Sequence, residues 1–470
     1  MALLLKSSNK VLFRLTCGLA PALWVVTLLL AGCSGVSQGT TQGSPNSGTP
    51  PPPTPPPPTA SSELFSLDVN SGVVAPWHPE PWPEVPFGSI RLWDSSTFWY
   101  QINPSQGVYD WSVLDAWLDK ANAGHQHILY TLGYTPAWAS SNPNDKTCIG
   151  PPGTCDPPND LNSDGSGTDQ HWKDYVTAVA SHSHNSSTAH IEAWEIWDEP
   201  FGSWEFSGTV AQMVRMAKDA YEIIKGIDPN AILLTPSIDW SWKQPLDWMA
   251  SYFAQGGGQY ADVISVHGYV FQDGGTFGEP ENVVPYLANF RAVLKTYGQD
   301  SKPIWDTEAS WGDSQKLGFT DPDLQAGWLA RFYILHRSNW IDRLFWFSYN
   351  STTNYGTLWI PDPQDQRLPG TLLKPGYAFG QVRNWLAGAN IMTGCSADST
   401  AWTCSLSGAG GYEGLIVWDT AGSCSQGICQ TVNYTVGSQY VRYQTLDGQT
   451  IPITDGIVQI GYKPILAENQ

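Results

Sequence analysis

The stretch Trp172–Trp197, WKDYVTAVASHSHNSSTAHIEAWEIW, joins an amphipathic segment to a short apolar one. The first part, Trp172–His182, mixes apolar and polar residues in the manner of a helix that covers a core with one face. The second part, Ile191–Trp197, is short and carries β-branched and aromatic side chains, which favours a buried strand. The stretch therefore predicts one helix–strand unit of an α/β fold.

The same alternation extends on both sides of this unit. Candidate strands are Phe65–Asn70, Ser89–Trp93, His127–Leu132, Ile191–Trp197, Ala231–Pro236, Val263–Tyr269, Pro303–Thr307 and Arg343–Ser348. Helix-like segments between them include Trp111–Asn122, Trp172–His182, Val210–Lys225, Val284–Tyr297 and Leu324–His336. Strands that alternate with helices form parallel sheets, and eight such units predict closure into a (β/α)8 TIM barrel over residues 63–390.

The pattern changes after a last helical stretch, Tyr377–Leu386. Within residues 391–470, short strand-like pieces are separated by Gly, Ser and Asp. These pieces are Gly414–Trp418, Gln430–Tyr434, Gln439–Thr445 and Ile457–Ile460. We expect a small, sandwich-like antiparallel β domain at the C-terminus.

The N-terminus resembles a bacterial export signal. Three basic residues precede an apolar run: Lys6, Lys10 and Arg14. The run, Leu15–Leu30, leads into Leu-Ala-Gly-Cys, which resembles a lipobox. We expect residues 1–33 to be a lipoprotein signal peptide, with an acylated Cys33 as the only membrane anchor. The alternative is a membrane-spanning anchor, but the run is shorter than the roughly 20 apolar residues that a span needs.

Residues 34–62 consist mainly of Ser, Gly, Thr and Pro, with proline runs at Pro50–Pro53 and Pro55–Pro58. Such a composition cannot form a core and predicts a semi-rigid, extended linker. Together with the lipobox, the linker predicts a protein anchored in the bacterial cell envelope, on the outer membrane or cell surface, or secreted.

Charge and aromatic content indicate the class of partner. The chain has 43 Asp and Glu against 23 Lys and Arg, a net charge of −20. This balance disfavours nucleic acid, and it also disfavours highly sulfated or uronic-acid-rich polysaccharides unless a local pocket of Arg and Lys binds them. The 24 tryptophans outnumber the 15 phenylalanines, and a flat indole suits the apolar face of a sugar ring. We expect a carbohydrate substrate, although core packing would also account for many of the tryptophans.

The chain has 8 cysteines, of which Cys17 and Cys33 lie in the expected signal. The others form three close pairs: Cys148 and Cys155, Cys395 and Cys404, Cys424 and Cys429. In an exported chain, such an even set suggests disulfides. Nearest-neighbour pairing is the simplest connectivity, and the others remain open. None of the pairs has the spacing of a zinc knuckle.

Two glutamates come at the ends of candidate strands. The fourth strand ends in Trp197-Asp198-Glu199-Pro200, and the seventh in Asp306-Thr307-Glu308. A (β/α)8 barrel carries its active site at the carboxyl ends of its strands, so Glu199 and Glu308 should face each other. Glycoside hydrolysis needs such a pair, because one carboxyl protonates the leaving oxygen and the other attacks or activates water.

The segment Trp194–Pro200 resembles the Asn-Glu-Pro motif of the barrel superfamily of retaining glycosidases, clan A. Ser89–Asp94, Tyr109–Trp111 and Asp306–Glu308 are most similar to glycoside hydrolase family 39 and its bacterial relatives. This resemblance covers roughly Phe65 to Gln470. It implies a retaining, double-displacement glycosidase, β-xylosidase-like or related, with Glu199 as acid/base and Glu308 as nucleophile.

The chain departs from the clan motif at Asp198, where the clan has Asn. That Asn binds the 2-hydroxyl of the sugar, and Asp can accept from a hydroxyl but has no amide to donate. The resemblance also places Arg91 against the nucleophile. The alternative for Arg91 is an ion pair with Glu195, which shares the strand face of Glu199 by the period of two.

His267 and Tyr269 end the sixth strand on one face, and the resemblance implies contacts with the nucleophile or the sugar. Other aromatic residues at strand ends are candidate sugar platforms: Trp138, Trp311, Trp346 and Tyr349. Packing at the barrel rim is the alternative for these four aromatic residues, and a buried histidine with satisfied hydrogen bonds is the alternative for His267.

No phosphate-binding glycine loop, Gly-x-Ser-x-Gly elbow or His-Glu-x-x-His helix occurs. We therefore expect no cofactor and no catalytic metal. Two other functions compete with the glycosidase. One is a non-catalytic glycan-binding lipoprotein on a glycosidase scaffold, which Asp198 favours. The other is a metal-dependent barrel hydrolase, which the lack of a histidine cluster disfavours.

Overall fold

The computed structural model describes residues 62–470, except 77–78, 273–275, 312–320, 351–355, 363–369, 392–393 and 426–427. The expected signal peptide, Cys33 and the linker up to residue 61 lie outside the described residues. Among the described helices, none has the length and apolarity needed to cross a membrane.

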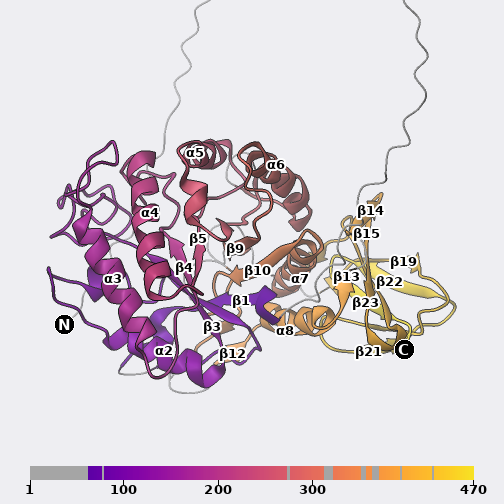
Figure 1. The fold of residues 1–470 in the computed structure, drawn as a ribbon. Coiled ribbons are helices and arrows are strands. Elements are labelled where there is room, and N and C mark those ends of the chain that lie inside the picture. The colour runs from indigo at the N-terminus through magenta and orange to yellow at the C-terminus, as the bar shows by residue number, and fades with distance from the viewer. Residues whose placement is uncertain are drawn as a thin grey trace, which may run out of the picture. The chain divides into compact units, whose positions relative to one another are not determined.

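The predicted barrel is present (Figure 1). Its strands are β1 (Phe65–Asp68), β2 (Ser89–Leu92), β3 (His127–Leu132), β4 (Ala193–Ile196), β5 (Ile232–Leu234), β6 (Ile264–Val266), β9 (Ile304–Ala309) and β10 (Ile341–Trp346). They form one parallel sheet in the order β5-β4-β3-β2-β1-β10-β9-β6. A parallel bridge from Leu234 to Val263 joins the two ends of this order, so the sheet is nearly closed. All eight candidate strands of the sequence correspond to strands of this sheet.

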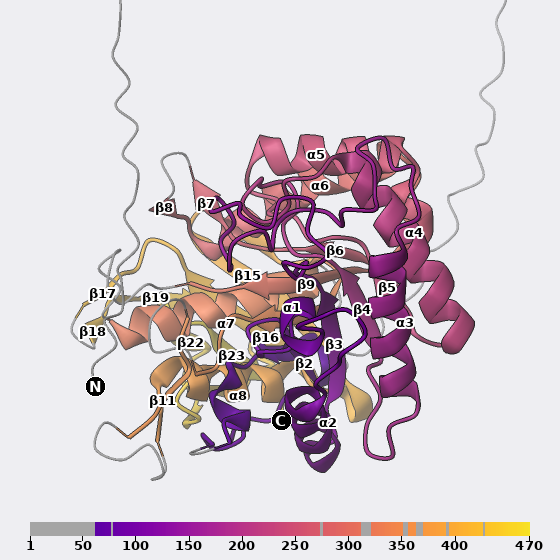
Figure 2. The same cartoon turned by 90° about the vertical axis from the view of Figure 1, so that its left-hand side faces the viewer.

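The longer helices pack around the outside of the sheet (Figures 1 and 2). They are α2 (Ser112–Gly124), α3 (Gln170–His184), α4 (Val210–Ile227), α5 (Lys243–Ala254), α6 (Val283–Thr296), α7 (Pro322–Ser338) and α8 (Lys374–Leu386). Helix α4 illustrates the local cause: Thr209 caps its N-terminus together with Gln212, and Met213, Met216 and Ala217 bury one face. The sequence pattern did not predict α5.

Helix α7 is buried over almost its whole length and circumference. It packs against α8 and against a C-terminal segment, where Tyr462 lies so close to Gly327 that any side chain at that position would collide with it. The aromatic residues Trp328 and Phe332 fill the opposite side, toward Trp346 of β10. The C-terminal region thus covers the face that an outer barrel helix would otherwise expose.

The C-terminal region is an antiparallel β domain, as predicted. Its main sheet contains β13 (Asn390–Ile391), β14 (Ser396–Asp398), β15 (Ala401–Ser407), β16 (Glu413–Asp419), β20 (Arg442–Gln444), β21 (Thr450–Pro452) and β23 (Ile465–Glu468). A second pair consists of β19 (Thr431–Thr435) and β22 (Ile457–Gly461). Buried Val417, Val436, Val458, Ile460 and Ile465 form its core.

The three disulfides join nearest neighbours. Cys395–Cys404 links the residue before β14 to β15. Cys424–Cys429 links β17 (Cys424–Ser425) to β18 (Ile428–Cys429). Cys148–Cys155 closes a turn in the long loop between β3 and α3. Of the connectivities that the sequence left open, the structure has the simplest one.

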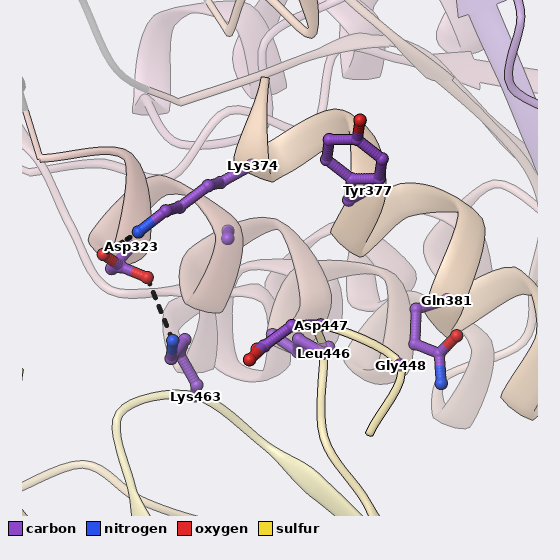
Figure 3. A pocket seen from close by; sticks show the side chains of 9 residues that line it. Asp323, Lys374, Tyr377, Gln381, Leu446, Asp447, Gly448 and Lys463 are labelled. Carbon is purple, nitrogen blue, oxygen red and sulfur yellow. Dashed lines mark hydrogen bonds and ion pairs between the residues drawn. The ribbon is translucent and has the colours of Figure 1, made fainter. Parts of the chain in front are cut away.

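Asp323, at the start of α7, ties the barrel to the β domain (Figure 3). Its carboxylate accepts hydrogen bonds from Lys374 at 2.6 Å and from Lys463 at 2.9 Å. Burial acts to raise the pKa of Asp323, but the two lysines outweigh it and lower the pKa. A cavity of about 540 Å³ lies here, lined by α7, α8 and the β domain and not by strand ends.

Candidate active site

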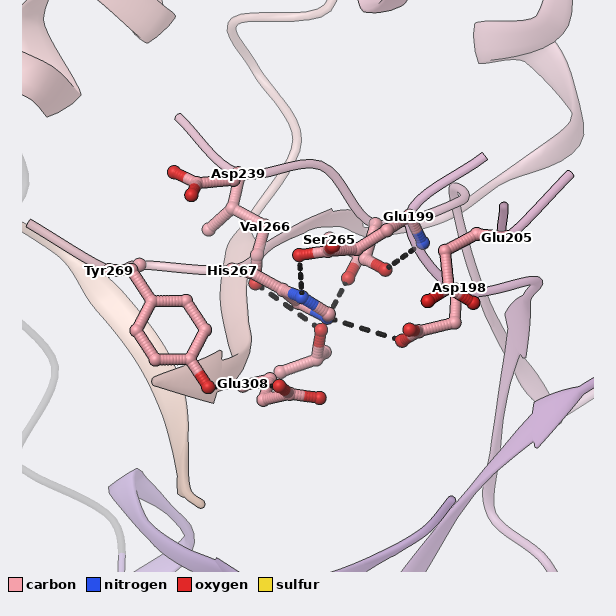
Figure 4. A network of polar contacts seen from close by, with 12 residues as sticks. Asp198, Glu199, Glu205, Asp239, Ser265, Val266, His267, Tyr269 and Glu308 are labelled. Carbon is pink, nitrogen blue, oxygen red and sulfur yellow. Dashed lines mark hydrogen bonds and ion pairs between the residues drawn. The ribbon is translucent and has the colours of Figure 1, made fainter. Parts of the chain in front are cut away.

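A second cavity of about 540 Å³ lies at the carboxyl ends of the barrel strands. Residues that follow β2, β3, β4, β5, β6 and β10 line it together with Glu308 of β9, and Glu199 is among the residues after β4. This is the face where TIM barrels carry their active sites. The polar groups around these two glutamates form one connected network (Figure 4).

Glu199 enters the cavity through an unusual turn after β4. Trp197 and Glu199 both have left-handed backbone conformations, with φ of 69° and 40°, which side-chain-bearing residues adopt only when their surroundings hold them. Trp197 is fully buried, and its indole N–H donates to the carbonyl of Glu205 at 2.9 Å. The Glu199 carboxylate lies 2.8 Å from Nδ1 of His267, and its backbone N–H donates to Ser237.

Glu308 faces the cavity because β9 is irregular near its end. Leu344 of β10 pairs with Asp306, but Trp346 pairs with Ala309, so β9 carries one extra residue between these pairs. Such a bulge changes the direction in which a side chain points. The Glu308 carboxylate accepts one hydrogen bond from Arg91 at 2.8 Å and one from the Tyr269 hydroxyl at 2.9 Å.

Arg91 on β2 is completely buried and is the centre of the network. It donates to Glu195 at 2.7 Å and 3.0 Å, to Asp198 at 2.5 Å, and to Glu308. Both interpretations of Arg91 from the sequence therefore hold. Burial acts to raise the pKa of Glu195, but Arg91, His267 and nearby hydroxyls outweigh it and lower the pKa.

His267 and Asp198 lie between the two glutamates. Burial acts to lower the pKa of His267, but the carboxylates of Glu308, Asp198 and Glu199 raise it to about 10, so the imidazole is charged at neutral pH. Burial raises the pKa of Asp198 to about 7, although Arg91 and His267 oppose this shift. Asp198 is therefore partly protonated near neutrality, and its protonated form has an O–H to donate.

The aromatic platforms expected from the sequence are not found in the cavity wall. Trp346 and Tyr349 are 0% exposed; the indole of Trp346 packs on α7, and Tyr349 stacks on Trp359. Trp311 stacks on Trp328 in the core, and Trp138 donates its indole N–H to the carbonyl of Asn103 at 2.9 Å. The aromatic residues that do line the cavity are Trp93, Phe98, Tyr100, Tyr134, Trp204, Tyr269, Phe271 and Phe347.

Three carboxyl groups in the cavity were not singled out from the sequence: Asp94, Glu205 and Asp239. Burial is the main cause that raises their pKa values, to about 6, about 8 and about 7 respectively. Asp94 is the second residue after β2, so its position near a strand end was a usable signal. Glu205 and Asp239 lie in loops whose course the sequence pattern does not indicate.

Asp198, His267 and Glu308 place potential metal-ligand atoms within 4.8 Å of one another. Arg91 already bonds to both carboxylates of this group, so a cation would have to compete with its guanidinium. The other such group, which contains Cys148 and Cys155, has its sulfur atoms in a disulfide. Neither group of described residues is arranged as a free metal site.

Residues 170–360 match the family model of the glycosyl hydrolase catalytic core. No curated protein sequence matches the chain. Three solved structures illustrate the similarity in fold. A family 39 β-xylosidase from Caulobacter crescentus is 15% identical with a TM-score of 0.58, covering 87% of this chain and 97% of the other. A glucosidase from Croceicoccus marinus is 17% identical with a TM-score of 0.56, covering 88% and 96%. A family 51 arabinofuranosidase from Xanthomonas axonopodis pv. citri is 11% identical with a TM-score of 0.55, covering 88% and 98%.

The match to the catalytic core spans both Glu199 and Glu308, and the similarity in fold extends over the barrel and the β domain. These findings support a glycosidase and confirm the resemblance to barrel glycosyl hydrolases; the similarity to a family 39 β-xylosidase is one of fold.

Proposed function

We propose that the protein is a retaining glycoside hydrolase, β-xylosidase-like or related, that cleaves a neutral glycan or oligosaccharide by double displacement. Glu308 is the nucleophile and Glu199 is the general acid/base. The observation that carries this proposal is the different surroundings of the two carboxylates within one cavity: Glu308 is held by Arg91 and Tyr269, whereas Glu199 is held by His267.

In the first step, a Glu308 oxygen attacks the anomeric carbon while Glu199 gives its proton to the leaving oxygen. Arg91 carries a permanent positive charge, which favours the carboxylate that attack requires. Glu199 becomes negative as it loses its proton, and the charged His267 at 2.8 Å offsets this charge. In the second step, Glu199 takes a proton from water, and the water oxygen replaces Glu308 at the anomeric carbon.

Asp198 takes the place of the amide that clan members use to bind the sugar. Its Oδ1 accepts from Arg91, which leaves the other oxygen to carry the proton. With a pKa of about 7, this carboxyl is able both to accept from and to donate to a sugar hydroxyl near neutral pH. The departure from the clan motif is therefore compatible with catalysis.

The test is the configuration of the product. The purified protein is screened against aryl xylosides, arabinofuranosides and glucosides, and the first-formed sugar of any cleaved substrate is followed by NMR. We expect the starting anomeric configuration to be kept. An inverted product would remove Glu308 as nucleophile, binding without turnover would favour the glycan-binding alternative, and loss of activity with a chelator would favour a metal-dependent hydrolase.

A further inference from the structure

The wall of the catalytic cavity is strongly acidic. Six of the lining side chains carry a carboxyl group: Asp94, Asp198, Glu199, Glu205, Asp239 and Glu308. None of the side chains that line the cavity, among the described residues, is a lysine, arginine or histidine. A ligand that enters this space meets carboxyl groups on several sides.

The basic groups beneath the cavity do not cancel this charge. Arg91 already contacts Glu195, Asp198 and Glu308, and its guanidinium is completely buried. His267 is paired with Glu199 at 2.8 Å. An anionic group on a sugar would therefore be placed among carboxylates, and the described residues offer it no free cation at this cavity.

Glu205 has a carboxyl oxygen available to a ligand. It is 5% exposed, and one oxygen accepts a hydrogen bond from the Tyr134 hydroxyl. The other oxygen has no hydrogen-bond partner among the described residues. Asp94 is close enough that its charge raises the pKa of Glu205. Neither Asp94 nor Glu205 has a role in the double displacement.

Three aromatic rings lie beside these two carboxyl groups. Trp93 precedes Asp94 in the chain, and its ring centroid lies 4.7 Å from Phe98 and 4.9 Å from Tyr134. Phe98 and Tyr134 stack at 5.3 Å, and all three rings line the cavity. Aromatic faces beside carboxylates are the surroundings that favour an ammonium group. Arg91 approaches Trp93 at 5.7 Å, but its charge is already shared among its carboxylate partners.

We propose that the cavity binds an amino sugar, whose ammonium group is held by Asp94 and Glu205 within the ring cluster of Trp93, Phe98 and Tyr134. This inference rests on the proposed glycosidase function, and it specifies the substrate class of the same site. A neutral sugar has no ammonium group to pair with these two carboxyl groups, and a uronic acid would meet their negative charge.

The pKa values of the two carboxyl groups agree with this assignment. Burial raises the pKa of Glu205 to about 8, and burial followed by the charge of Glu308 raises that of Asp94 to about 6. Without a ligand, these carboxyl groups are therefore partly protonated, and a bound ammonium group would displace their protons. Binding of a cation should be accompanied by proton release, whereas binding of a neutral sugar should not.

The test is a binding titration that does not depend on turnover. Methyl glycosides of glucosamine, N-acetylglucosamine, glucose and glucuronic acid are titrated by calorimetry at pH 7, and the galactose series serves as a second ring configuration. We expect the amino sugar of at least one series to bind about tenfold or more tightly than its neutral counterpart. N-acetylation should remove this gain, and the uronic acid should not bind.

The variants Asp94→Asn and Glu205→Gln should each lose the preference for the amino sugar and keep the affinity for the neutral one. Glu222→Gln, on the exposed face of α4, is the matched control. If Glu205→Gln fails to fold, the solvent-accessible Asp94 provides the same test. The inference is overturned by equal or weaker binding of the amino sugars, by a preference that both variants retain, or by no binding of any sugar. Turnover of neutral aryl glycosides without an amino-sugar preference would overturn only this inference and leave the glycosidase intact.

Discussion

The carboxyl ends of β4 and β9, here called the two mouths, each present a glutamate carboxylate, but with different partners. At β9, the Glu308 carboxylate is bound by Arg91, whose charge is permanent, and by the neutral Tyr269 hydroxyl. At β4, the Glu199 carboxylate is bound by His267, whose charge depends on pH. A nucleophile has to stay ionised throughout a cycle, whereas an acid/base has to gain and lose a proton. This difference in partners supports the two roles proposed for Glu308 and Glu199.

The backbone differs at the two mouths as well. Glu308 is turned into the cavity by a bulge within a strand, so it remains part of the hydrogen-bonded sheet. Glu199 lies beyond the end of its strand, in a turn with two left-handed residues that buried Trp197 keeps in place. The proposed nucleophile is therefore held by the barrel sheet, and the proposed acid/base is held by packing in a loop.

The largest expected effect is that of Glu308→Ala. Loss of the nucleophile should lower the rate on aryl glycosides by about 10⁴-fold or more, because no covalent intermediate forms. Added azide should enter the vacated space, restore part of the rate and give a glycosyl azide of inverted configuration, identified by NMR. Glu222→Ala, on the exposed face of α4, is the control. An azide product of retained configuration would assign the nucleophile to another residue.

Glu199→Ala should have a smaller effect that depends on the leaving group. Substrates with poor leaving groups should lose about 10²–10⁴-fold, because they need the proton, and substrates with good ones should lose less. For the latter, the second step becomes slow, so pre-steady-state measurements should show a burst. Azide should restore turnover with retained configuration, since it needs no general base. An equal loss for all leaving groups would contradict the role of Glu199.

Residues at the ends of regular strands could be predicted from the sequence. Arg91, Glu199, His267, Tyr269 and Glu308 were all singled out there, and the structure brings them into one network. The carboxyl ends of parallel strands meet at one face of a barrel, so the order of strands alone places these residues together.

Apart from Tyr269, the aromatic residues that line the cavity were not predicted in this way. Along β10, Phe345 points into the barrel and Trp346 points out toward Trp328, so the next residue, Phe347, is the one that lines the cavity. The large indole made Trp346 the candidate sugar platform, but the alternation of side chains along the strand determines which residue faces the cavity. Loop residues such as Glu205 could not be predicted, because their positions depend on contacts between loops that are far apart in the sequence.

The smallest expected effect concerns stability and again separates the two mouths. His267 has a pKa of about 10 in the folded chain against 6.5 for an ordinary histidine. Between these values the folded state binds more protons than the unfolded state, so the stabilisation is complete below pH 6.5 and is lost as pH rises toward 10. Buried Asp198 and Asp239 each have a pKa of about 7 in the folded chain. Between about pH 4 and pH 7 the folded chain keeps the protons of these two groups and the unfolded chain releases them, so they too make the free energy of unfolding fall as pH rises. Arg91 keeps its charge throughout and adds no slope.

The free energy of unfolding, measured in urea at intervals from pH 5 to pH 9.5, should therefore fall as pH rises, by at most about 1.4 kcal/mol per pH unit for each proton involved. In His267→Gln the slope above pH 7 should become flatter, with Glu205 and its pKa of about 8 keeping part of it, and His184→Gln, at an exposed site, should leave the slope unchanged. An unchanged upper slope in His267→Gln would mean that the imidazole beside Glu199 is neutral in the folded chain, and the charge difference between the two mouths would then have to come from Arg91 alone.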